Sequence, residues 1–190
     1  MFADDTAPSM AINVFTIGHS TRSVDEVVRM LRSNDVTMLA DVRSFPSSRA
    51  FPQWNQTSLI EALPDDIDYR WIRDLGGRRH TPAGMHSGNE GWRVKAFRDY
   101  ADYMSTPSFR TGIDTLLTLA NHQVTAIMCS EAVPWRCHRR LITDALLVRG
   151  VQVSDIMTED QTRTASLTPF ARVDAGSITY PREEPNDDPA

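Results

Sequence analysis

The sequence predicts a single three-layer α/β domain, with a mostly parallel sheet of about five strands and helices on both faces. Short apolar runs alternate with segments whose apolar residues recur at helical spacing, which is typical of strand–helix–strand units. The 190 residues are enough for one well-buried domain and short for two. The interior contains no repeat and no low-complexity linker, which also favours one domain.

Each element is expected from its own local pattern. Ser23 stands three residues before Glu26, the capping-box arrangement of a helix start, and Gly150 follows the last helical segment. Pro46 ends the second strand. The expected strands are 13–20, 36–46, 67–72, 124–131 and 151–157. The expected helices are 23–35, 57–63, 89–105, 108–121 and 135–149.

Both ends of the chain are expected to lie outside the folded domain. Residues 1–12 are rich in Ala, Asp and Pro without periodicity, which predicts a disordered N-terminus. Residues 176–190 read as an acidic, disordered tail, so the α/β domain is expected over 13–175.

The composition excludes several classes of protein. No run reaches the 18 or so apolar residues of a membrane span, and no basic segment precedes an apolar core at the N-terminus. A cytoplasmic protein without a membrane partner is therefore expected. Two cysteines do not make a disulfide scaffold. The net charge of −5 comes from the two ends, so the overall charge of the domain does not indicate nucleic-acid binding, and basic residues cluster only locally, at 76–80 and 136–140.

Polar residues follow every expected strand. In open α/β sheets, ligands bind outside the carboxyl ends of the strands, so these residues are expected to line one pocket. We expect Glu131, Asp41 and His19 to act as catalytic groups, and the expected binding residues are Ser20, Arg43, Arg78, Cys129, His138 and Arg139.

The stretch from Cys129 to Arg140, CSEAVPWRCHRR, holds both cysteines and allows three functional interpretations. It contains metal-ligand types, but the seven residues between Cys129 and Cys137 do not match the spacing of a structural zinc site. A phosphatase-like cysteine loop fits poorly, because Arg136 is seven residues from Cys129 and bulky residues lie between them. In the third interpretation Glu131 is the catalytic general acid or base. Cys137 is expected to pack on one face of the following helix.

Four motifs in order resemble a known family: TIGHS, DVRSFPSS, LGGRR and CSEAVPWRCHR. Together they resemble the domain-of-unknown-function family 488 over about residues 14–157. The resemblance implies a compact α/β domain with polar residues at the strand ends. It implies no reaction.

The function expected from these residues is hydrolysis of an anionic small molecule, a nucleotide or a modified base. Arginines would hold the anion, and Glu131 or Asp41 would transfer protons. A non-catalytic module that binds a nucleotide or nucleic acid is the alternative, and a metal-binding protein using Cys, His and Glu is a further one. No cofactor is predicted, since GHSTRS is not a dinucleotide fingerprint and a P-loop is lacking. No pattern indicates an oligomeric state.

Overall fold

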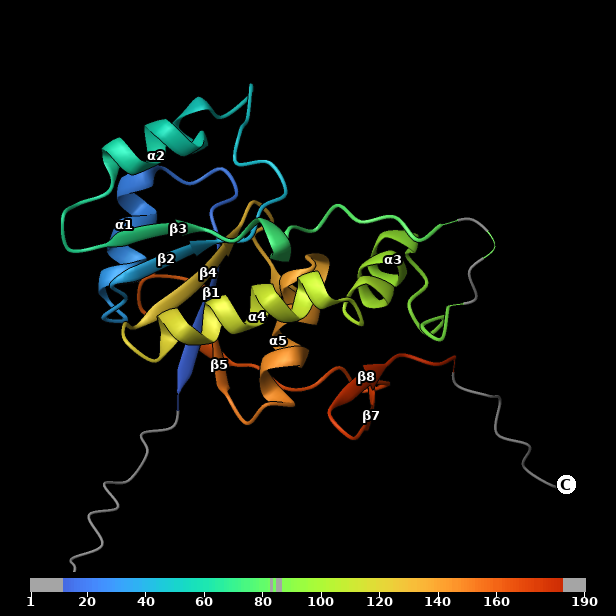
Figure 1. Ribbon diagram of the computed structural model, residues 1–190. Helices are drawn as coiled ribbons and strands as arrows, with labels where there is room; N and C mark the ends of the chain where they lie inside the picture. Colours follow the sequence, from blue (N-terminus) through green and yellow to red (C-terminus); the bar gives the residue numbers. More distant parts are fainter. Residues whose placement is uncertain (1–11, 83, 85–86, 183–190) are drawn as a thin grey trace, which may run out of the picture.

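The computed structural model describes residues 12–82, 84 and 87–182, and the predicted α/β domain is confirmed within them. A six-stranded sheet has the order β3-β2-β4-β1-β5-β6, in which β1 to β5 are parallel and β6 is antiparallel to β5 (Figure 1). Its strands are β1 (Asn13–Gly18), β2 (Met38–Asp41), β3 (Asp68–Trp71), β4 (Thr125–Cys129), β5 (Gln152–Ile156) and β6 (Thr162–Thr164).

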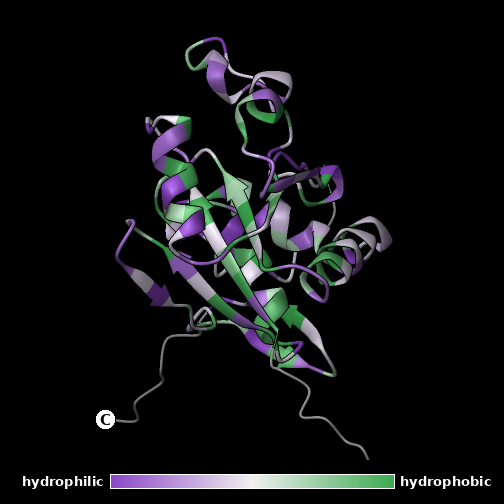
Figure 2. Cartoon of the chain, turned by 90° about the vertical axis from the view of Figure 1, so that its left-hand side faces the viewer, coloured by the Kyte–Doolittle hydropathy of each residue, from purple (hydrophilic) through white to green (hydrophobic). Residues whose placement is uncertain are grey.

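Helices cover both faces of this sheet. The α-helices are α1 (Val24–Arg32), α2 (Gln56–Ala62), α3 (Lys95–Tyr103), α4 (Pro107–Ala120) and α5 (Arg139–Leu147). Single 3₁₀ turns lie at η1 (Pro52–Trp54), η2 (Arg73–Leu75) and η3 (Pro134–Arg136). One core cluster contains α1 and α2, and the other contains residues of α3, α4 and α5. Figure 2 shows hydrophobic residues gathered on the central strands between these layers.

The alternation of side chains along β4 decides which residues face which layer. Ala126 and Met128 belong to the core shared with α1 and α2, whereas Ile127 and Cys129 belong to the core shared with α4 and α5. Cys129 therefore ends the strand on the face that carries α5.

Three short strands were missed by the sequence prediction. β6 pairs with β5, and β7 (Arg172–Asp174) forms a hairpin with β8 (Ser177–Thr179). Each has three residues, nearly all exposed, so none shows the apolar alternation by which a strand is recognised.

The helix expected from Trp135 begins later, at Arg139. Pro134 starts the separate turn η3, and Cys137 then has an extended backbone with φ −131° and ψ 147°. Cys137 is buried, as expected, but it lies in this link and not on the face of α5. The cause is the break after Arg136, which shifts the helical register.

The expectation of a disordered tail from residue 176 is wrong for residues 177–180. β8 occupies Ser177–Thr179, and the Tyr180 ring is fully buried. The Tyr180 hydroxyl donates to Asp144 Oδ2 at 2.8 Å, and Thr168 donates to the same buried carboxylate. An aromatic anchor thus holds this segment against α5, although the composition around it is acidic.

Residues 1–11 of the expected disordered N-terminus and residues 183–190 of the expected tail lie outside the described residues. In the described part of the chain, no helix combines the length and apolar character that crossing a membrane requires.

Tyr180→Ala is expected to lower the free energy of unfolding by about 3–5 kcal/mol, because it removes a fully buried ring and a partner of Asp144. Chemical denaturation measures the change. Val173→Ala on the neighbouring β7–β8 hairpin is the control, since Val173 is 46% exposed and its loss should cost less than about 0.5 kcal/mol. Equal effects of the two substitutions would contradict the anchoring role.

Candidate functional site

The parallel register brings the ends of β1 and β4 together. Gly18 pairs with Cys129, and the chain continues this pairing when His19 N–H donates to the Cys129 carbonyl at 3.0 Å. Ser20 N–H donates to the Ser130 carbonyl at 2.9 Å, with Ser20 in the left-handed region at φ 48°. The residues that follow β1 therefore lie beside the residues at the end of β4, at the carboxyl edge of the sheet.

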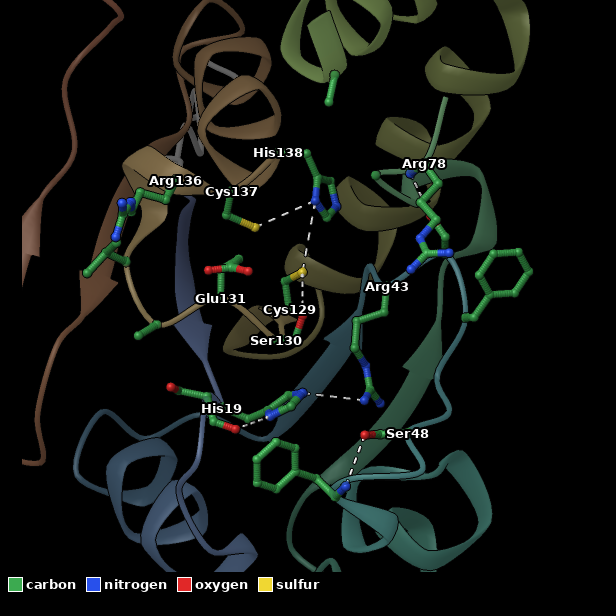
Figure 3. A pocket seen from close by; sticks show the side chains of 18 of the residues that line it. His19, Arg43, Ser48, Arg78, Cys129, Ser130, Glu131, Arg136, Cys137 and His138 are labelled. Atoms are coloured by element: carbon green, nitrogen blue, oxygen red, sulfur yellow. Dashed lines mark hydrogen bonds between the residues drawn. The ribbon is translucent and has the colours of Figure 1, made fainter. Parts of the chain in front are cut away.

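A pocket of about 1010 Å³ opens at this edge (Figure 3). Most of the predicted site residues line it: His19, Ser20, Arg43, Arg78, Cys129, Glu131 and His138. Its lining also includes residues that the sequence argument did not select, among them Phe45, Gly77, Arg136 and Cys137. Asp41 and Arg139 are not part of the lining.

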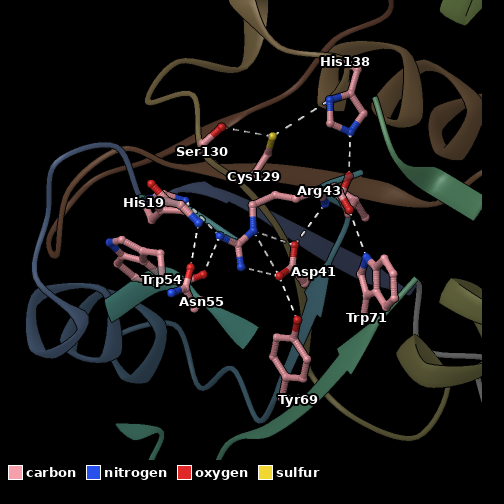
Figure 4. Close-up of polar contacts among 12 residues, drawn as sticks. His19, Asp41, Arg43, Trp54, Asn55, Tyr69, Trp71, Cys129, Ser130 and His138 are labelled. Atoms are coloured by element: carbon pink, nitrogen blue, oxygen red, sulfur yellow. Dashed lines mark hydrogen bonds and ion pairs between the residues drawn. The ribbon is translucent and has the colours of Figure 1, made fainter. Parts of the chain in front are cut away.

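Asp41 is fully buried and its carboxylate is occupied by neighbours (Figure 4). Arg43 Nε lies 2.9 and 3.0 Å from its two oxygens, and the Tyr69 hydroxyl donates to Oδ2 at 2.8 Å. Burial is the main cause that raises the pKa of Tyr69 above its ordinary value, and the negative charge of Asp41 is the second. The phenol therefore keeps its proton and donates a hydrogen bond to Asp41. Asp41 therefore orients Arg43 and does not reach the pocket.

Arg43 lines the pocket, but its guanidinium is already bonded within the fold. Besides Asp41, it donates to the Trp54 carbonyl at 2.8 Å and lies 3.5 Å from His19 Nε2. These contacts leave Arg43 poorly placed to bind an anion by itself.

His19 is 3% exposed and stacks on Trp54, with ring centroids 4.2 Å apart. Its Nδ1 donates to the Ser20 carbonyl at 3.0 Å, which leaves Nε2 as an acceptor facing Arg43. Burial, together with the positive charge of Arg43, lowers the pKa of His19 to about 4. The imidazole is therefore neutral at pH 7.

Arg139 supports the loop that carries Glu131. Its buried guanidinium donates to the Glu131 carbonyl at 2.6 Å and to Thr16 Oγ1 at 3.0 Å. Gly18 lies so close that a Cβ atom there would be 1.8 Å from the Glu131 carbonyl oxygen, so only glycine fits. The backbone of Glu131 is thereby held from two directions, while its side chain is exposed in the pocket.

Two thiols and an imidazole form a compact group in the pocket wall. His138 Nδ1 lies 3.6 Å from Cys137 Sγ and 3.9 Å from Cys129 Sγ. A hydrogen bond from the Cys129 thiol, together with the charge of Arg139, lowers the pKa of Cys137 to about 6. The same contact, together with burial, raises the pKa of Cys129 to about 12.

Residues 23–146 match the model of the family described as "Domain of unknown function DUF488". The chain belongs to the DUF488 family. Comparisons with curated proteins and with solved structures found no match.

The matched range of this DUF488 domain covers β2, β3, β4 and all of α5 except its last residue, and so includes Asp41, Glu131, Cys137 and His138. It begins after His19 and Ser20, which come from the end of β1. The match is therefore narrower than the resemblance over residues 14–157.

The DUF488 site also contains residues that sequence reasoning passed over. Cys137 was assigned to core packing because a helix was expected to begin at Trp135. The signal that could have corrected this is Pro134, which starts its own short turn. Gly77 carried no local signal, since its role depends on the ring of His138 from another part of the chain.

Asp41→Asn is expected to lower the free energy of unfolding by about 3–5 kcal/mol, because it leaves the charge of Arg43 buried without its counterion. Thermal or urea unfolding measures this. The matched control is Asp66→Asn, which breaks an ion pair with Arg32 whose side chains are 52% and 55% exposed. That change should cost much less, because solvent screens an exposed ion pair and its side chains lose entropy when they pair. Similar costs for the two pairs would refute the buried-pair argument.

The stability of the protein should depend on pH through His19. Because its folded pKa of about 4 lies below the unfolded value of 6.5, the unfolded chain binds the proton more readily, and stability falls as pH drops from 6.5 to 4. Replacing His19 by Gln should remove up to about 3 kcal/mol of this pH-dependent loss. Urea unfolding at several pH values measures it, with exposed His122→Gln as control. An unchanged pH profile in His19→Gln would contradict the assignment.

Proposed function

We propose that this DUF488 domain is an enzyme that hydrolyses an anionic small molecule, a nucleotide or a modified base, in the pocket at the strand ends. The position of Glu131 carries the proposal. Its exposed carboxylate lies in the pocket, and its backbone is held by Arg139 and by the close approach of Gly18. A proton-transferring group on a fixed backbone is what general acid–base catalysis requires.

Arg78 and Arg136 are the groups that would bind the anion. Both are exposed, and they lie on opposite sides of the pocket with Glu131 between them (Figure 3). Among the described residues, neither guanidinium has an ion-pair partner. Planar guanidinium groups pair well with phosphate and carboxylate. In this proposal they take the role first given to Arg43 and Arg139, which are already bonded.

An aromatic surface beside Arg78 favours a nucleotide or base over a purely aliphatic anion. Phe45 lines the pocket and is 63% exposed, and the Arg78 guanidinium lies 5.7 Å from its ring centroid. A flat base could stack on such a ring, an interaction worth about 1–3 kcal/mol per base. Phe51 adds a second ring to the lining.

In the proposed reaction Glu131 accepts a proton from water, and the resulting hydroxide attacks the substrate. Glu131 then returns the proton to the leaving group, so that water is divided between the two products. Neutral His19 has a positioning role, since its Nε2 faces Arg43 at the floor of the pocket.

The test measures release of phosphate, free base and ammonia from a panel of nucleoside monophosphates and base-modified nucleotides. For a panel member that is turned over, Glu131→Gln should lower kcat by about 100-fold or more and leave binding intact. Arg78→Ala and Arg136→Ala should each weaken binding about 10- to 100-fold, because each removes a charged hydrogen-bond donor. Arg172→Ala, an exposed arginine on β7, is the control and should change neither.

Two outcomes would contradict the proposal. Retained nucleotide binding without turnover of any panel member would favour a non-catalytic binding module. Binding that does not weaken as salt rises would argue against the two arginines as its source.

A further inference from the structure

The thiols of Cys129 and Cys137 and the ring of His138 have the dimensions of a metal site. Their ligand atoms all lie within 4.8 Å of one another, and Nδ1 is 3.6 and 3.9 Å from the two sulfur atoms. Zinc bonds of about 2.3 Å to sulfur and about 2.05 Å to nitrogen, at tetrahedral angles, separate these atoms by about 3.6 Å. One ion could therefore bind all three with little movement.

The imidazole of His138 is already oriented for such an ion. Its Nε2 donates to the Val42 carbonyl at 2.9 Å, which makes Nδ1 the unprotonated acceptor that faces the sulfurs. Metal-binding histidines commonly donate their second ring nitrogen in this way. Gly77 allows the ring to lie there, because a Cβ at Gly77 would be 2.4 Å from Nδ1.

The three residues come from two segments, which explains why their spacing did not suggest a metal. Cys129 ends β4, and Cys137 and His138 follow the turn η3 before α5. The short spacing of structural zinc sites applies to ligands on one local turn. Here the chain reverses at the turn η3, which brings Cys137 and His138 back beside Cys129.

All three ligand residues line the pocket, so a bound ion would face its contents. Zinc sites with three protein ligands and one open position are typical of catalysis, whereas structural sites have four protein ligands. Glu131 projects into the same pocket but is not one of the three clustered ligands.

We propose that Cys129, Cys137 and His138 bind one zinc ion whose fourth position, open to the pocket, holds water. Two thiolates and one imidazole favour zinc over magnesium or calcium, which prefer oxygen ligands. Metal binding goes beyond the proposed function and does not depend on it.

If the proposed hydrolysis takes place, the ion supplies its nucleophile. The bound water transfers a proton to Glu131, the remaining hydroxide adds to the electrophilic atom of the substrate, and Glu131 passes the proton to the leaving group. Nucleobase deaminases use two cysteines, one histidine and a glutamate that is not a ligand for hydrolysis of this kind.

The first experiment measures metal content of the full chain, purified under reducing conditions without chelator from zinc-supplemented cells. Elemental analysis should find about one zinc per chain. Replacement by Co²⁺ should produce the intense sulfur-to-cobalt charge-transfer absorption of thiolate ligands. Circular dichroism of the same samples establishes that the protein is folded.

Substitutions then test the ligand set. Cys129→Ser, Cys137→Ser and His138→Asn should each weaken zinc binding by more than about 100-fold in competition with a chelator of known affinity. Gly77→Ala should weaken it about 10- to 100-fold, since it displaces the ring and keeps all three ligands. Gly77→Ala thus tests the site even where a ligand variant fails to fold. Exposed His122→Asn is the control and should bind as the wild type does.

Folded wild-type protein without stoichiometric zinc and without cobalt–thiolate absorption would overturn the metal site. A Cys129–Cys137 disulfide, found by mass spectrometry of the protein after removal of reductant in the presence of zinc, would do the same.

The metal site and the proposed hydrolysis can each fail without the other. Zinc without turnover of the substrate panel leaves the metal site standing, whereas turnover in metal-free protein supports the enzyme alone.

Discussion

The buried guanidinium of Arg139 connects the parts on which the site depends. It reaches from the start of α5 to Thr16 on β1 and to the carbonyl of Glu131 after β4. The side chain of Arg139 is 1% exposed, and its Nε has no hydrogen-bond partner among the described residues. Losing either bond of the terminal nitrogens would add to the cost of burying this charge, and the loop is therefore held in its path. Cys137 and His138 directly precede Arg139, and the same contact therefore fixes their place against Cys129.

The arginines at this edge of the sheet fall into a buried pair and an exposed pair, which differ in their contacts. Arg43 and Arg139 are buried, bonded to partners within the fold, and hold loops in position. Arg78 and Arg136 are exposed and line the pocket, where the proposed function assigns them to the ligand. This division separates the groups that build the pocket from those that would contact its contents.

The proposed zinc ion and the proposed hydrolysis use different atoms of one pocket wall. The soft ligands lie deep, where Cys129 and Cys137 are buried, and the carboxylate of Glu131 lies toward solvent. Such an arrangement could activate water at the metal and take its proton at the carboxylate. The ring of His138 is oriented by its hydrogen bond to the Val42 carbonyl and by the space that Gly77 leaves for it, and the proposed ion depends on this ring more than on any other ligand.

The sequence by itself determined the fold class, the five parallel strands and the edge where polar residues gather, because these follow from local periodicity and from the geometry of parallel sheets. Only the tertiary structure decided which polar residues are free. The carboxylate of Asp41 accepts hydrogen bonds from Arg43 and Tyr69 and is not available to a ligand. A turn brings Cys137 close to Cys129, and Tyr180 anchors a segment that was expected to be disordered. Each outcome depends on contacts between distant segments, and burial and pairing of this kind leave no local pattern in the chain.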